Sequence, residues 1–257
     1  MYKPLPIGVD NFEKMIHEGY YYVDKTLLIK ELLDLKGEVN LFTRPRRFGK
    51  TLNLSMLRYF FEDTGEEKEN ARNRELFHGM KIMETGEGYT SYMGKYPVIN
   101  LTLKSAKRED YEAACYAVRA EIAVEFERHR NMIERGKGKI SHKEYEQYLA
   151  IAEEKADNNE IRNSLLLFCR CMYKIMGKKA VILIDEYDVP LENAYFNGFY
   201  TKMTGFIRSL FEAGLKTNEY MQFAVITGCL RISKESIFTG LNHLNIISVL
   251  DRKYSEH

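Results

Sequence analysis

The amino-acid sequence predicts an α/β fold in which helices cover a mainly parallel β-sheet. Short apolar runs typical of strands occur at residues 38–43, 96–103, 179–186 and 222–228, and a weaker run follows at 245–250. Long segments with helical patterns connect these strands, as parallel pairing requires. Polar clusters follow three of the strands directly, so a ligand is expected at the carboxyl edge of the sheet.

The size and composition are typical of a globular protein with a sizeable core. The chain has 257 residues, 45% of them hydrophobic, and is expected to form a single domain over residues 1–257. Its 38 Lys and Arg residues balance 37 Asp and Glu residues, which excludes attraction of the whole chain to nucleic acid or to an anionic membrane. No signal segment or membrane-spanning run is found in the sequence, so we expect a soluble, cytoplasmic protein. The four cysteines form no C-x-x-C pair and are interpreted as reduced structural thiols.

The N-terminal part predicts a helix, a strand, a loop and a second helix. Residues 20–37 carry leucines at helical spacing and end in a glycine, which is typical of a helix end. The strand at 38–43 leads into a loop at 44–49. The segment 50–63 has the apolar pattern of a helix packed on both sides. Residues 63–95, rich in charge and glycine, predict a small helical excursion and exposed connections.

Helices predominate after the second strand, in a predicted insertion at about residues 105–177. Two apolar stripes at helical spacing support this insertion. The stripes are Tyr111, Cys115, Val118, Ile122 and Phe126, and then Ile161, Leu165, Phe168, Met172 and Ile175. The charged segment 142–156 between them predicts an exposed helix. A further helix is predicted at 199–216, before the fourth strand.

The loop after the first strand ends like a phosphate-binding loop but begins differently. The residues RPRRFGKT match the pattern G-x-x-x-x-G-K-[ST], except that Arg44 replaces the first glycine. Gly49 allows the backbone to approach an anion, Lys50 can bind the β- and γ-phosphates of a nucleotide, and the Thr51 hydroxyl can ligate Mg²⁺. The candidate nucleotide-binding residues are therefore Arg44, Pro45, Arg46, Arg47, Phe48, Gly49, Lys50, Thr51 and Leu52.

Two later polar clusters complete the candidate site. Asp185 ends an apolar strand and can hold the metal ion together with Thr51, while Glu186 is placed to deprotonate an attacking water. Arg231, four residues beyond Thr227, can contact the γ-phosphate and stabilise charge that develops there. The candidate catalytic residues are thus Glu186, Lys50 and Arg231, and the candidate metal ligands are Thr51 and Asp185.

Each cluster also has an explanation that needs no ligand. The GKT triplet can occur in a basic turn, Asp185 and Glu186 in a solvated strand end, and Arg231 in a surface salt bridge. Asp188 can cap the turn that ends at Pro190. The clusters follow one another in the chain order of an ATPase, which favours a nucleotide site over these separate explanations.

Four sequence blocks together resemble the predicted AAA-ATPase-like family of bacterial proteins. They are PIGVDNFEKMIHEGYYYVDKT, LFTRPRRFGKTLNLSMLRYFFE, VILIDEYDVPL and ITGCLRISKESIFTGLNHL, and they extend from about residue 4 to about residue 250. In that family the loop regularly starts with arginine and proline, as Arg44 and Pro45 do here. The resemblance implies a P-loop NTPase sandwich of three layers with strand order 5-1-4-3-2. It also implies Walker roles for Lys50, Thr51, Asp185 and Glu186, and a sensor position for Arg231.

Full-length members of that family usually continue into a helical segment and a nuclease-like domain of the PD-(D/E)xK class. This chain ends at LDRKYSEH, so we expect the C-terminal lid and the nuclease region to be missing. Work on nucleic acid driven by ATP would then belong to a longer parent protein.

We expect an ATP-binding domain that hydrolyses ATP with Mg²⁺, slowly or under stimulation by a partner. An alternative is a nucleotide-gated switch or scaffold that binds ATP with little turnover. Glu186 favours the enzyme, whereas the missing lid favours the switch. A P-loop kinase is a third interpretation, and assembly into an oligomer stays open.

The basic residues of the loop are predicted to have different partners. Nucleic-acid binding through Arg44, Arg46, Arg47 and Arg58 is a fourth interpretation, which is compatible with ATP binding. Three guanidinium groups crowded beside Lys50 would repel one another unless each had an anionic partner. At least one of the loop arginines is therefore predicted to face outward.

Overall fold

All five strands of the sheet are parallel and lie in the order β2-β3-β4-β1-β5. The computed structural model describes residues 3–230, 237–238 and 244–248. Counted from the opposite edge, the strand order is 5-1-4-3-2, which confirms the predicted fold class. The strands are β1 (Val39–Thr43), β2 (Val98–Thr102), β3 (Ala180–Asp185), β4 (Met221–Gly228) and β5 (Leu244–Ser248).

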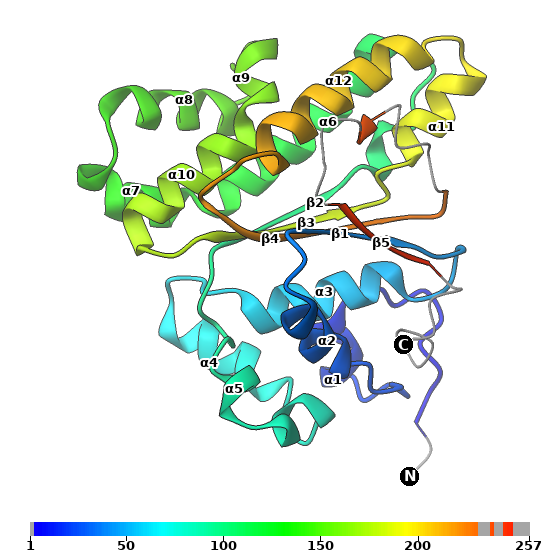
Figure 1. Ribbon diagram of the computed structural model, residues 1–257, viewed down its shortest axis with the longest axis vertical. Helices are drawn as coiled ribbons and strands as arrows, with labels where there is room; N and C mark the ends of the chain where they lie inside the picture. The colour runs from blue at the N-terminus through cyan, green and yellow to red at the C-terminus, as the bar shows by residue number, and fades with distance from the viewer. Residues whose placement is uncertain (1–2, 231–236, 239–243, 249–257) are drawn as a thin grey trace.

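Helices cover both faces of the sheet and complete a sandwich of three layers (Figure 1). The lower layer in Figure 1 contains α1 (Phe12–His17), α2 (Leu27–Leu35), α3 (Lys50–Phe61), α4 (Glu67–Glu75) and α5 (Glu87–Thr90). The upper layer contains α6 (Tyr111–Arg128), α7 (Arg130–Gly136), α8 (His142–Ala152), α9 (Asn158–Arg162), α10 (Ser164–Met176), α11 (Val189–Phe196) and α12 (Tyr200–Leu215). Short 3-10 helices are η1 (Lys81–Thr85), η2 (Lys104–Ala106) and η3 (Lys137–Lys139). No helix within the residues that the structure describes has both the length and the apolar composition needed to cross a membrane.

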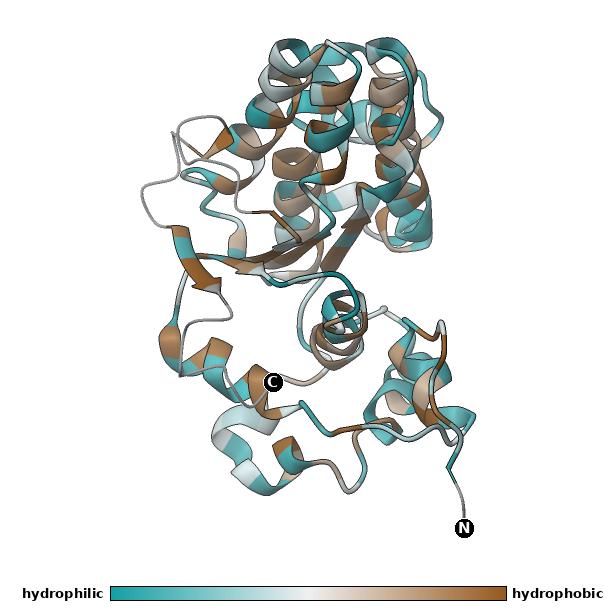
Figure 2. Ribbon diagram, turned by 90° about the vertical axis from the view of Figure 1, so that its right-hand side faces the viewer, coloured by the Kyte–Doolittle hydropathy of each residue, from teal (hydrophilic) through white to brown (hydrophobic). Residues whose placement is uncertain are grey.

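The strands bury both of their faces because successive side chains point to opposite sides of the sheet. In β3, Ile182 and Ile184 belong to the core under the upper helices, whereas Val181 and Leu183 belong to the core around α3. All residues of β3 are buried, as the continuous apolar run predicted. Figure 2 shows the strands mainly in the hydrophobic colour, while the helices carry residues of both kinds. The sheet therefore gives the loops at its carboxyl edge a rigid base.

Two helical predictions were wrong in detail. The charged segment forms α8, but this helix is not simply exposed, because Tyr148 is fully buried and its hydroxyl donates to the Phe126 carbonyl oxygen at 2.7 Å. The second apolar stripe is divided between α9 and α10, since Asn163 ends α9 before α10 begins. The many charged residues of α8 concealed its buried face in the sequence. The apolar periodicity alone did not show the break between α9 and α10.

Side chains of the upper layer satisfy the free edge of β2. The Arg128 guanidinium donates to the Val98 carbonyl oxygen at 2.8 Å, and His129 Nε2 lies 2.9 Å from the same oxygen. The Asn100 N–H donates to Glu125 Oε1 at 2.7 Å. An edge strand with unpaired backbone groups is a template for unwanted pairing. These contacts close part of that edge from α6.

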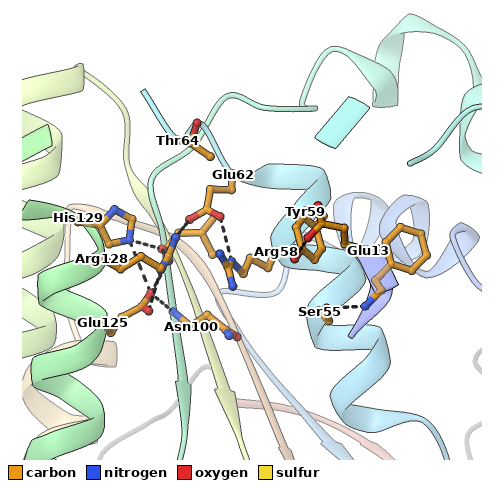
Figure 3. A network of polar contacts seen from close by, with 12 residues as sticks. Glu13, Ser55, Arg58, Tyr59, Glu62, Thr64, Asn100, Glu125, Arg128 and His129 are labelled. Carbon is orange, nitrogen blue, oxygen red and sulfur yellow. Dashed lines mark hydrogen bonds and ion pairs between the residues drawn. The ribbon is translucent and has the colours of Figure 1, made fainter. Parts of the chain in front are cut away.

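The same network reaches the end of α3 and so joins the two helical layers (Figure 3). Glu62 is 1% exposed and accepts from the Arg128 guanidinium and, at 3.0 Å, from Arg58 Nε. Burial alone would raise the pKa of Glu125, but the nearby charge of Arg128 and the hydrogen bond from His129 lower it below its ordinary value. Arg128 thus neutralises two buried carboxylates at once.

Candidate functional site

The loop between β1 and α3 takes a path that does not need glycine at its first position. The Arg44 N–H donates to the Gly228 carbonyl oxygen at 3.1 Å, so the loop continues the contact between β1 and β4. Within the loop, positive φ angles occur at Arg47 (70°) and Gly49 (72°), and Arg44 has none. Glycine relieves strain only where φ is positive. The departure at Arg44 is therefore compatible with a loop that curves around an anion.

Lys50 lies with its ammonium inside the curve of this loop. Its Nζ donates to the carbonyl oxygens of Arg44 at 2.9 Å and Pro45 at 3.0 Å, and to Cys229 Sγ at 3.3 Å. Two of these acceptors belong to the loop and the third to the turn after β4. Lys50 is the first residue of α3, and its ammonium is thereby held at the centre of the candidate site.

Three side chains meet where α3 begins and where β3 and β4 end. The Thr51 hydroxyl donates to Asp185 Oδ2 at 2.6 Å, and the Thr227 hydroxyl donates to Asp185 Oδ1. The Glu186 N–H donates to the same Oδ1 at 3.0 Å. Residues from three distant parts of the chain are thus joined through one buried carboxylate. Parallel strands end at one edge of the sheet, which is why these side chains meet.

Glu186 follows Asp185 in an unusual backbone conformation. Its φ angle is 53°, a left-handed geometry that a non-glycine residue adopts at some cost. Burial raises the pKa of Glu186, and the neighbouring charge of Asp185 raises it further, while Lys104 opposes the shift. A pocket beside Glu186 is lined by Thr51, Asp185, Lys104 and Arg58. This carboxylate therefore faces space that a small molecule can enter.

The donor set fits Mg²⁺ better than a metal held by the protein alone. Thr51 and Asp185 supply a hydroxyl and a carboxylate, the hard oxygen ligands that Mg²⁺ prefers. Nowhere in the described part of the chain do three or more His, Cys, Asp or Glu side chains form a group that could hold a metal ion. Mg²⁺ usually takes one or two protein ligands and completes its shell with phosphates and water. The site therefore fits Mg²⁺ delivered together with a nucleotide.

At least one loop arginine faces outward, as their mutual repulsion predicted. The Arg46 side chain is 76% exposed, and its guanidinium lies 3.8 Å from Glu192 Oε2 on α11. Arg44 lines a pocket with Phe48 and Lys50 on the α2 side of the loop. Arg47 is exposed. Nucleic-acid binding by these arginines stays a prediction.

The remaining candidate residues differ in what the structure describes. Pro45 is exposed and supplies a carbonyl oxygen to Lys50, whereas Leu52 is half-buried against the core around α3. Arg231 lies outside the described residues. The chain up to Leu230 places the preceding turn beside the loop.

The sequence offered a cap on the turn that ends at Pro190 as one explanation of Asp188, but its side chain does not have that role. It is the N-cap residue of α11 but makes no capping hydrogen bond with its side chain. Instead, Asp188 Oδ2 accepts from the N–H groups of Cys229 at 2.9 Å and Leu230 at 2.7 Å. The sequence held one signal for this role, the second aspartate in DEYD. It did not show the partners of Asp188, because they follow a different strand.

Close packing of these two turns predicts that Gly228→Ala destabilises the protein. A Cβ at Gly228 would lie 2.5 Å from Tyr187 Cε1 and 2.8 Å from Asp188 Oδ1, and both side chains are buried. Overpacking of this kind typically costs about 1–3 kcal/mol. Urea unfolding should show this loss, whereas Gly138→Ala, which meets no atom within 4 Å, should leave stability nearly unchanged. Equal stability of the two variants would contradict the packing argument.

Comparison with known proteins gives a family and a relative of this chain. Residues 6–238 match the family described as predicted AAA-ATPase. An uncharacterized protein in the vnfD 5'region of Azotobacter chroococcum mcd 1 is 31% identical over 256 residues. That alignment covers 98% of this chain but 42% of the relative, so the chain spans less than half of the relative's length. No solved structure matches the chain. Because the family match includes both the loop and the turn after β3, the chain belongs to the predicted AAA-ATPase family.

Proposed function

We propose that this domain binds ATP together with Mg²⁺ and hydrolyses it, slowly or under stimulation by a partner. The observation that carries the proposal is the meeting of Thr51, Asp185 and Thr227 beside Lys50. A basic turn would not need a buried carboxylate hydrogen-bonded to the first turn of the next helix. A nucleotide site needs this combination of a cation, a hydroxyl and a carboxylate.

Each side chain has a distinct task in this proposal. The N–H groups at the start of α3, a helix of 12 residues, bind the phosphates, and Lys50 binds the β- and γ-phosphates. Thr51 and Asp185 hold Mg²⁺, which when bound neutralises phosphate charge. Thr227 keeps the Asp185 carboxylate oriented. Glu186 accepts a proton from the water whose oxygen attacks the γ-phosphorus, while the bond between that phosphorus and the β–γ bridging oxygen breaks and ADP leaves.

Internal hydrogen bonds support slow turnover. Lys50 has three acceptors within the protein, and the Thr51 hydroxyl donates to Asp185. The two loop-carbonyl contacts of Lys50 and the contact of Thr51 with Asp185 have to be exchanged for contacts with phosphate and metal, whereas Cys229 Sγ can keep the third hydrogen of the Lys50 ammonium. Nucleotide binding therefore includes a local rearrangement. The same observation supports a second candidate, a switch that binds ATP with little turnover. Incubation with Mg-ATP separates the candidates, since an ATPase releases phosphate, a switch binds without release and a kinase transfers phosphate to an acceptor.

Lys50→Ala should weaken ATP binding at least tenfold, which is about 1.4 kcal/mol. The substitution removes the ammonium at the centre of the loop, while the fold should persist because the acceptors of Lys50 among the described residues are two carbonyl oxygens and a thiol, not a buried carboxylate. Isothermal titration calorimetry measures the effect. Lys107→Ala removes an exposed lysine outside the site and serves as the control. Equal ATP affinity of Lys50→Ala and wild type would show that the loop is a basic turn.

A further inference from the structure

Two adjacent side chains in the turn after β3 form hydrogen bonds with the backbone of the turn after β4. Asp188 Oδ2 accepts from the N–H groups of Cys229 and Leu230, at 2.9 and 2.7 Å. The Tyr187 hydroxyl donates to the Leu230 carbonyl oxygen at 2.6 Å. We call Tyr187 and Asp188 the clamp, because they hold both the donors and an acceptor of the second turn.

Both residues of the clamp are buried, and they restrict the movement of the turn at residues 228–230. Tyr187 is 0% exposed and Asp188 is 1% exposed. The Tyr187 N–H also donates to the Thr227 carbonyl oxygen at 3.1 Å, so the two turns touch before the clamp begins. Gly228 has no side chain at the point where a Cβ would meet both members of the clamp. A buried acceptor shared by two N–H groups is costly to lose, since both donors would then lack a partner.

The turn after β4, at residues 228–230, contacts the loop between β1 and α3 at two places. The Gly228 carbonyl oxygen accepts from the Arg44 N–H at 3.1 Å, and Cys229 Sγ accepts from Lys50 Nζ at 3.3 Å. The first contact fixes the position of the backbone at the start of the loop. The second fixes the position of the Lys50 ammonium at its end. Residues 228–230 therefore connect the clamp with both ends of the loop.

We propose that Tyr187 and Asp188 are positioning residues that hold the Cys229 turn against Lys50 and thereby preorganise the loop for ATP. The part of this inference that concerns ATP rests on the proposed function. Preorganisation strengthens binding because the loop then loses less freedom when the ligand arrives. Without the clamp, the turn can move away from the loop, and Lys50 loses its sulfur acceptor.

Cys229 supplies a direct measure of the clamp that needs no nucleotide. Its thiol is half-buried, whereas the other three cysteines, Cys115, Cys169 and Cys171, are buried. Alkylation with iodoacetamide, read for each cysteine by mass spectrometry, separates local from global opening. Movement of the turn alone exposes Cys229, while unfolding exposes all four thiols.

Asp188→Ala removes the acceptor of both N–H groups, so the turn should open. We expect alkylation of Cys229 to become at least fivefold faster, with the other thiols unchanged, and ATP affinity to fall at least fivefold. Asp188→Asn should restore most of the slow alkylation, because its amide oxygen can accept the same two hydrogen bonds. Rescue by Asn would show that the acceptor, and not the negative charge, holds the turn.

Tyr187→Phe keeps the ring in the core and removes only the hydroxyl, so it decides the outcome if Asp188→Ala does not fold. This variant should also accelerate alkylation of Cys229 selectively. Unchanged Cys229 alkylation in the folded variants, or an equal rise at all four thiols, would overturn the clamp. If the wild type binds no ATP, the proposed function fails while the alkylation result still tests the clamp. If ATP affinity is unchanged in a variant whose Cys229 reacts faster, the clamp exists but its role in preorganising the loop is refuted.

Discussion

Glu186→Gln should lower ATP turnover by roughly 10²-fold or more while the affinity for Mg-ATP stays nearly unchanged. Glutamine has the size of glutamate and keeps an oxygen acceptor, but it does not take a proton from water at neutral pH. The carboxylate lies beside Asp185 in the pocket that adjoins Thr51, so its loss affects the reacting water more than the phosphates. Phosphate release measures turnover, and calorimetry measures affinity.

Two controls make the Glu186 result specific. Glu109→Gln removes an exposed carboxylate after η2 and should change neither quantity. Asp185→Asn should instead weaken the dependence on Mg²⁺, because Asp185 is the carboxylate that faces Thr51 and Thr227. Turnover by Glu186→Gln at the wild-type rate would exclude Glu186 as the base. If neither the wild type nor Glu186→Gln releases phosphate while both bind ATP, the result would favour the switch.

The strands could be predicted because their signal is local. The run AVILID in β3 is apolar at every position before its final Asp185, and so short an apolar run is typical of a strand covered on both faces. The order of the strands is a different matter. Apolar runs do not show which strands are neighbours, and the order 5-1-4-3-2 was implied by family resemblance before the structure confirmed it.

The candidate site divides in the same way. Lys50, Thr51 and Asp185 could be brought together in advance because strand ends share one edge of a parallel sheet. The partners of Asp188 could not, since its carboxylate binds backbone N–H groups, which every residue carries. Arg128 likewise gives no local signal for its contact with Glu62, 66 residues earlier in the chain. Contacts between distant side chains and backbone groups are set by tertiary packing, which periodicity does not encode.

Arg128→Met should destabilise the fold by about 3–5 kcal/mol, the usual cost of breaking a buried ion pair from one side. Methionine approximates the length of the arginine stem, so the main change is the loss of the guanidinium. Glu62 retains Arg58, whereas the partner that Glu125 retains among the described residues is His129, whose Nε2 lies 3.6 Å away and which is charged only if protonated. The Val98 carbonyl oxygen also loses its hydrogen bond from Arg128 and keeps its contact with His129 (Figure 3). Urea unfolding at neutral pH measures the difference.

Acidic pH should reduce this difference, and the sign follows from the lowered pKa of Glu125. A carboxyl whose pKa is lower in the folded state stabilises the fold above its unfolded pKa of about 4.3, and this contribution is lost as pH falls towards the folded pKa. The variant lacks the arginine that causes the lowering, so it loses less as the carboxyl is protonated. The gap between wild type and Arg128→Met should therefore be largest near neutrality and shrink below about pH 4.3.

Arg130→Met is the matched control, because Arg130 pairs at the surface with Glu127, whose side chain is 54% exposed. Surface pairs of this kind contribute about 0–1 kcal/mol. If Arg128→Met costs no more than Arg130→Met, or if its cost does not change between neutral and acidic pH, the network does not depend on the guanidinium. The predicted result would instead mean that the Arg128 guanidinium contributes several kcal/mol to the contact between the edge of β2, the upper helical layer and the end of α3, beside the backbone hydrogen bonds that join Phe61 and Asp63 to Tyr96.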